Sequence, residues 1–143
     1  LLPAGQAGSL KNVQNISLVF SADESKHDLS VLKTFFPGSI NIKDYKGESL
    51  QEVLIVTLFT KIAAWEGSSG IRNEEINIIR DLIKKSRHSI VISFGSPYVL
   101  RYFMEADALI AAYDTTLQAQ SYVIKCLRGE AVFQGRLPVE LND

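Results

Sequence analysis

Trp65 and Glu66 stand side by side in a segment that continues as Gly-Ser-Ser-Gly. An aromatic ring can stack on the face of a sugar, and a neighbouring carboxylate can accept hydrogen bonds from its hydroxyl groups. Asp23 and Asp114 are further carboxylates that closely follow apolar runs of the chain. We predict these four residues as contacts at the edge of a substrate site and assign no catalytic residue. The alternative interpretation of Glu66 is a solvated loop carboxylate.

Serine, histidine and cysteine residues form no recognisable catalytic or metal-binding set. Ser96 lacks the flanking glycines of a nucleophile elbow and is interpreted as a helix cap. His27 and His88 have no acidic or thiol partner at ligand spacing, and Cys126 is the single cysteine. Residues 21–26 contain no glycine, so the first expected strand is not followed by a phosphate-binding loop. We therefore expect no metal and no cofactor.

Composition limits the classes of partner. The chain has 143 residues, 46% of them hydrophobic, which suits one compact domain. Its 15 basic and 16 acidic residues leave a net charge of −1, without the basic surface that nucleic acids or anionic membranes require. No apolar run approaches the roughly 20 residues of a membrane span, so we expect no nucleic acid partner and no membrane contact by this segment. The sequence opens on Leu-Leu-Pro without an initiator methionine, and we expect a fragment or a processed product.

Short apolar runs separated by polar, glycine-containing or proline-containing segments predict the strands. Continuous runs suit strands that are buried on both faces, whereas alternation or a proline suits an edge. The expected buried strands are Ile16–Phe20, Val53–Phe59, Ile90–Phe94 and Ala108–Tyr113, and the expected edge strands are Ile40–Ile42 and Leu137–Leu141.

Helices are predicted between these runs from capping residues and apolar spacing. One is capped by Asp28 and stopped by Pro37. A second is capped by Asn73 and presents Ile76, Ile79, Leu82 and Ile83 on one face. A third follows Gly95, with Ser96 as its cap, Pro97 in its first turn, and Tyr98, Tyr102 and Phe103 packed on the sheet. A fourth begins at a capping box of Thr115 and Gln118 and ends at Gly129.

Alternating strands and helices predict an α/β fold, because strands joined by helices run parallel through right-handed crossovers. We expect a three-layer αβα sandwich with a mostly parallel, open sheet of about six strands, the last of which can run antiparallel at an edge. Ligands bind such sheets beyond the carboxyl ends of the strands. That rim would collect Asp23, Ser93, Gly95, Ser96, Tyr113, Asp114 and the loop 65–70.

Three motifs resemble a known family. SFGSPYVL (93–100), ADALIAAY (106–113) and GEAVFQGRLPVEL (129–141) are similar to the C-terminal α/β sandwich domain of family 3 glycoside hydrolases, and most similar to the bacterial β-N-acetylglucosaminidase branch. The resemblance extends to the loop 65–70, to Leu2-Pro3 and to the first strand. It implies an N-terminal (β/α)8 barrel that supplies the aspartate nucleophile and a histidine general acid with its aspartate partner. No motif of that barrel occurs here.

The resemblance implies that residues 1–14 are a linker from a preceding domain and that 15–143 are the C-terminal-type domain. The implied function is a non-catalytic part of a retaining β-N-acetylglucosaminidase, which packs on the barrel, shapes the edge of the sugar site and meets carbohydrate through that barrel. A glutamate of this domain is the acid/base in other branches, so Glu66 is a conceivable counterpart, although the branch motifs argue against that role. A periplasmic or secreted location is favoured over the cytoplasm.

Two alternatives stay open at this point. The same sandwich can serve as an interaction or linker module without sugar contact. It can also be a small independent α/β hydrolase that uses Asp23, Ser96 or Glu66.

Overall fold

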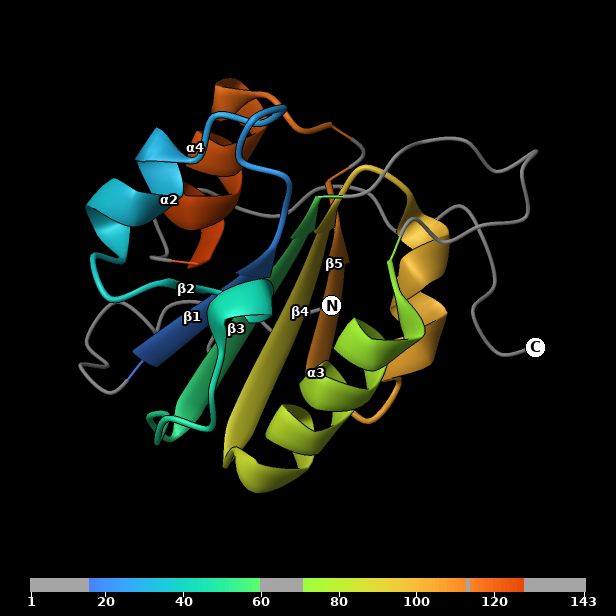
Figure 1. Cartoon of the computed structure of the whole chain (residues 1–143). Coiled ribbons are helices and arrows are strands. Elements are labelled where there is room, and N and C mark those ends of the chain that lie inside the picture. Colours follow the sequence, from blue (N-terminus) through green and yellow to red (C-terminus); the bar gives the residue numbers. More distant parts are fainter. Residues whose placement is uncertain (1–15, 60–70, 113, 128–143) are drawn as a thin grey trace.

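Five parallel strands form one sheet in the computed structural model, which describes residues 16–59, 71–112 and 114–127 (Figure 1). Their order across the sheet is β2-β1-β3-β4-β5. The strands are β1 (Ile16–Ser21), β2 (Ile40–Asn41), β3 (Val53–Phe59), β4 (His88–Phe94) and β5 (Ala108–Ala111).

All neighbouring strands are paired in parallel. In the centre of the sheet, Val56 of β3 is in register with Val19 of β1 and Val91 of β4. Because every strand points the same way, all the loops that follow strands leave from one edge, which we call the carboxyl edge. The opposite edge, where the strands begin, is the amino edge.

Helices cover both faces of the sheet, which confirms the expected three-layer αβα sandwich. Helices α2 and α4 lie on one face, and α3 and the 3-10 helix η4 lie on the other (Figure 1). A short 3-10 helix, η2, follows β2. The bounds are α2 (Ser30–Phe35), η2 (Ile42–Asp44), α3 (Asn73–Lys85), η4 (Pro97–Phe103) and α4 (Leu117–Leu127).

Strand β3 is buried along its whole length and divides the interior into two cores. Successive side chains of a strand point to opposite faces. Ile55 and Phe59 therefore join the core under α2 and α4, whereas Leu54, Val56 and Leu58 join the core under α3 and η4. The apolar face predicted for α3 is confirmed, since Ile76, Ile79, Leu82 and Ile83 are all buried.

The predicted helix starts are displaced by about one residue. Arg72, and not Asn73, is the N-cap of α3. At α4 the residue before the helix is Thr116, whose Oγ1 accepts from the backbone N–H of Ala119 at 3.2 Å, so the predicted Thr115 cap is wrong. Leu29 is the N-cap of α2, although Asp28 Oδ1 accepts from the N–H of Ser30 at 2.9 Å.

The segment after β4 is a 3-10 helix and not an α-helix. The cap is confirmed, because Ser96 Oγ accepts from the N–H of Tyr98 at 3.3 Å. Phe103 is buried as predicted, but the burial predicted for Tyr98 is wrong, since 42% of this residue is exposed.

Several strand ends differ from the prediction by one or two residues: β1 ends at Ser21, β4 begins at His88 and β5 ends at Ala111. Strand β2 lies at an edge of the sheet as expected, but Ile42 begins η2 instead of extending the strand. The predicted strand Leu137–Leu141 and the Gly129 cap lie outside the described residues, as does the linker 1–14.

Candidate functional site at the carboxyl edge

The carboxyl edge contains a point at which the strand order reverses. The chain moves outward from β1 to β2 through α2 on one face, and from β3 to β4 through α3 on the other. Ligands of open α/β sheets bind in the crevice beyond the carboxyl ends at such a point. The loops after β1 and β3 are therefore the favoured position for a site.

Two of the four predicted site residues lie at this edge. Asp23 lies in the loop after β1, and Asp114 lies in the loop after β5. Strands β3 and β4 stand between β1 and β5 in the sheet, so these two carboxylates leave it from strands that are not neighbours. Trp65 and Glu66, like Tyr113, lie outside the described residues, and their contacts remain predictions.

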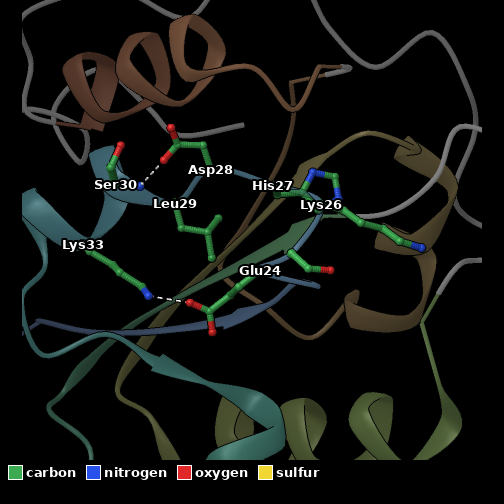
Figure 2. Close-up of a pocket in the computed structure, with 8 residues that line it drawn as sticks. Glu24, Lys26, His27, Asp28, Leu29, Ser30 and Lys33 are labelled. Carbon is green, nitrogen blue, oxygen red and sulfur yellow. Dashed lines mark hydrogen bonds and ion pairs between the residues drawn. The ribbon is translucent and has the colours of Figure 1, made fainter.

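A cavity of about 590 Å³ lies beside the loop after β1 (Figure 2). We call it the β1–α2 pocket. Its walls carry carboxylate, ammonium, imidazole and hydroxyl groups over one apolar residue. The residues that line it are Glu24, Ser25, Lys26, His27, Asp28, Leu29, Ser30 and Lys33.

One wall of the pocket is held by a buried amide of the edge strand. Glu24 Oε1 accepts from Lys33 Nζ at 2.5 Å, and Oε2 accepts from Asn41 Nδ2 at 3.3 Å. Asn41 is only 5% exposed, and the same Nδ2 donates to the backbone oxygen of Ala22 at 3.2 Å. The Lys33 hydrogen bond, followed by that of Asn41, lowers the pKa of Glu24.

A second buried amide holds the opposite wall. Gln120 of α4 is fully buried, and its Nε2 donates to the backbone oxygen of Asp28 at 2.9 Å and to that of Thr115 at 3.2 Å. It therefore connects the loop after β1 with the loop after β5. Gln120 and Asp28 are 92 residues apart in the sequence. The pKa of the Asp28 carboxyl is lowered chiefly by the hydrogen bond from the N–H of Ser30.

The Asp23 side chain stabilises the turn at the start of the same loop by hydrogen bonds to Ser25. Its Oδ1 accepts from the hydroxyl of Ser25 at 2.6 Å and from its N–H at 3.0 Å, and both bonds lower the pKa of Asp23. The lowered pKa values of Asp23, Glu24 and Asp28 favour the deprotonated form of all three side chains. Groups of this kind accept hydrogen bonds and are poorly suited to act as general acids, which need a raised pKa.

An aromatic row joins the loop to the sheet. The ring of His27 lies 5.4 Å from that of Phe59 at the end of β3, and Phe59 stacks on Phe94 at the end of β4 with centroids 5.0 Å apart. Contacts of this kind stabilise beyond their buried area. His27 is partly buried and anchors the loop after β1 through this contact.

The end of β4 is built for a tight turn and not for nucleophilic chemistry. Gly95 has φ +132°, a region that L side chains rarely adopt. Ser93 Oγ donates to the backbone oxygen of Ser96 at 2.5 Å, and Ser96 is itself buried at the cap of η4. The interpretation of Ser96 as a cap is confirmed.

Asp114 forms the corresponding turn before α4. Its two carboxylate oxygens accept from the N–H of Thr116 at 3.0 Å and from the Thr116 hydroxyl at 3.2 Å. The side chain is exposed, so a ligand contact is sterically open to it.

Sequence reasoning missed several residues of this edge. Glu75, in the first turn of α3, accepts from the hydroxyl of Ser21 at 3.0 Å and pairs with Arg72 at 3.7 Å. An acidic residue in a first helical turn is so common that its position gave no sign of this contact. Glu24, Asn41 and Gln120 were also missed, because contacts between distant segments leave no local pattern.

Metal-ligand clusters and membrane-spanning helices are both absent from the described residues. In residues 16–59, 71–112 and 114–127, no three His, Cys, Asp or Glu side chains gather as metal ligands. Within the same ranges, no helix has the length and apolar character needed to cross a membrane.

Comparison with known proteins gave matches at the level of structure. No protein-family model matches the chain, and no curated protein does. A solved fungal multi-domain GH3 β-N-acetylglucosaminidase, described as having a GCN5-related glucosamine N-acetyltransferase region, matches 88% of this chain with a TM-score of 0.64 and 16% identity. The β-glucoside phosphorylase BglX matches 89% with a TM-score of 0.61, also at 16% identity. The chain spans only 15% and 26% of these two proteins, and the likeness shows a shared fold.

Proposed function

We propose that this chain is a non-catalytic, C-terminal-type domain of a family 3 glycoside hydrolase of the bacterial β-N-acetylglucosaminidase branch. In this proposal its carboxyl edge packs on a catalytic (β/α)8 barrel and shapes the edge of the sugar site. The observation that carries the proposal is that nearly the whole fold recurs as a minor part of two larger proteins, both named for β-linked sugars. The sequence motifs at 93–100, 106–113 and 129–141 support the same family.

The non-catalytic role is supported by the state of the carboxylates. Retaining hydrolysis needs a nucleophile and an acid/base about 5 Å apart, and the acid must keep its proton near neutral pH. The three carboxyls in the loop after β1 have lowered pKa values, so they lose their protons too easily for that task. The nucleophile and its acid would come from the barrel.

The proposal is tested by kinetics of the longest chain that the gene encodes around these 143 residues. We expect Glu66→Gln, Asp23→Asn or Asp114→Asn to raise KM for a chromogenic β-N-acetylglucosaminide by about three- to tenfold, with kcat within about twofold, because a lost substrate hydrogen bond is worth about 1 kcal/mol. Trp65→Phe should raise KM as well, because its smaller ring covers less of the sugar face. Glu52→Gln is the matched control, since Glu52 precedes β3 at the amino edge and its side chain is exposed.

Two results would count against the proposal. If all four variants kept the parental KM, the domain would not contact the sugar that the barrel binds. If Glu66→Gln lowered kcat by a hundredfold or more, about the effect of losing a general acid or base, the domain would be catalytic.

A further inference from the structure

The β1–α2 pocket is anchored to the rest of the protein by three contacts, although it lies in a loop. Its two acidic walls are fixed from inside the protein by Asn41, which binds Glu24, and by Gln120, which binds the backbone at Asp28. Both amides are more than nine-tenths buried. His27 adds a third anchor through its contact with Phe59. Fixed polar groups bind a ligand with less loss of conformational freedom than mobile ones.

The charges of the pocket indicate a ligand without net charge. Glu24 and Asp28 oppose Lys26 and Lys33 among the lining residues. Lys33 points toward Glu24 and bonds to it, whereas Lys26 extends away from that pair (Figure 2) and lies 3.9 Å from Asp23. A phosphate would need ammonium groups that are not already paired, and a metal ion would need carboxylates that are not already bound to donors.

Hydrogen-bonding capacity remains on these same groups. Each ionised carboxylate oxygen can accept more than one hydrogen bond, and an ammonium group has three protons to donate. The Glu24–Lys33 pair therefore presents acceptors and a donor side by side, which suits adjacent hydroxyl groups of a ligand. The pocket is broadly open to solvent, and its volume of about 590 Å³ leaves room for a small ligand on the surface.

We propose that the β1–α2 pocket binds a neutral sugar unit, with Glu24 and Asp28 accepting from its hydroxyl groups and Lys33 donating to them. The pocket adjoins the point of strand reversal, where ligands of such sheets bind. The choice of a sugar among neutral polyols rests on the proposed function. The pocket would be an accessory carbohydrate contact of this domain, apart from the barrel's catalytic centre.

The test is an NMR titration of the ¹⁵N-labelled 143-residue chain with N-acetylglucosamine, with N,N′-diacetylchitobiose and, separately, with inorganic phosphate. We expect saturable shifts of backbone amides within residues 24–33 for the sugars, with a Kd on the order of 1 mM. Glu24→Gln should weaken the binding about tenfold, because it removes a charged acceptor. Lys33→Gln should weaken it as well, and Glu52→Gln should leave it within about twofold of the parent.

Three results would overturn the inference. They are the absence of saturable shifts at sugar concentrations ten times the expected Kd, tighter binding of phosphate than of sugar, and equal affinity in the parent and Glu24→Gln. This readout needs no catalysis, so its failure is separate from failure of the proposed function, which is judged by the kinetics of the longer chain. Sugar binding by the pocket would stand even if the substitutions of Trp65, Glu66, Asp23 and Asp114 left KM unchanged.

Discussion

Thr57, in the middle of β3, is a buried residue with an unusual hydroxyl. Its side chain is 1% exposed, and its Oγ1 finds no hydrogen-bond partner among the residues that the structure describes. A buried hydroxyl without a partner costs about 1–3 kcal/mol. Thr57→Val replaces the hydroxyl with a methyl group, and we expect it to raise the free energy of unfolding by about 1 kcal/mol in urea denaturation.

A matched control is Thr116→Val. The Thr116 hydroxyl caps α4 by accepting from the N–H of Ala119, and its loss should lower the free energy of unfolding by about 1 kcal/mol. The two substitutions are chemically identical and should act in opposite directions. A loss of stability in Thr57→Val would contradict the account and indicate that its hydroxyl is satisfied in solution.

The carboxylates in the loop after β1 make stability depend on pH. Hydrogen bonds lower the pKa of Glu24 from its ordinary value of 4.5, and those of Asp23 and Asp28 from 3.8. A carboxyl with a lower pKa in the folded state stabilises the fold above its unfolded pKa, and this contribution is lost as pH falls through the folded pKa. We expect these groups to contribute a constant amount above about pH 5 and to lose that contribution as pH falls below 4.5.

Urea unfolding between neutral pH and about pH 2.5 measures this effect. Glu24→Gln should flatten the pH dependence in the acid range, because its amide does not titrate. Glu105, whose pKa is also lowered, would still contribute in the variant. An acid dependence that is identical in parent and variant would show that Glu24 is not held as the structure has it.

At the scale of elements, the turn after β4 depends on Gly95. A side chain at φ +132° is strained, and strain of this kind costs about 1–3 kcal/mol. We expect Gly95→Ala to lower the free energy of unfolding by that amount in urea denaturation. Gly38→Ala is the control, because a Cβ there would meet nothing within 4 Å and its φ is not in the strained range. Equal effects of the two substitutions would refute the assignment of strain to Gly95.

The contact of α4 with the two loops can be tested through Gln120. Gln120→Met keeps the length of the side chain but removes its hydrogen bonds to Asp28 and Thr115. We expect faster hydrogen exchange at the amides of residues 28–30 and 115–117. The net change in unfolding free energy should be small, because Met also removes the buried Gln120 Oε1, which has no hydrogen-bond partner among the described residues. Gln118→Met, on the exposed side of the same helix, should change neither. Unaltered exchange in Gln120→Met would mean that packing alone holds the loops.

Elements with a continuous apolar run or a clear helical period were predictable from sequence. Strand β3 has the predicted bounds, and helix α3 has the predicted apolar face with its start displaced by one residue, because burial on both faces and a single apolar stripe leave unambiguous patterns. The η4 segment was mistaken for an α-helix. Its buried Pro97, Leu100 and Phe103 recur every three residues, and Tyr98 falls on the exposed face with Met104, as a 3-10 helix requires.

The site was predictable only in part. The carboxyl edge followed from the alternation of strands and helices, and it does carry Asp23 and Asp114. The β1–α2 pocket could not be predicted in this way, because its walls depend on Asn41 of the edge strand and Gln120 of the last helix. Amides of this kind look like ordinary polar residues until the tertiary fold brings them to a loop.

At the scale of the whole molecule, the two edges of the sheet differ in character. The carboxyl edge gathers the strand reversal, the aromatic row of His27, Phe59 and Phe94, and the β1–α2 pocket. The amino edge has a smaller pocket, of about 220 Å³, between residues 45–51 and the end of α3, and backbone bonds from Arg87 and His88 to Glu52. The proposed function assigns the carboxyl edge to the barrel because the strand reversal lies there.

The most direct test of the central claim is hydrolysis of a chromogenic β-N-acetylglucosaminide by two proteins side by side. One is the 143-residue chain, and the other is the longest chain that its gene encodes. The account predicts turnover by the longer chain and none by the 143 residues alone. Turnover by the 143-residue chain that is lost in Glu66→Gln, Asp23→Asn or Ser96→Ala would contradict it, and so would inactivity of the longer chain.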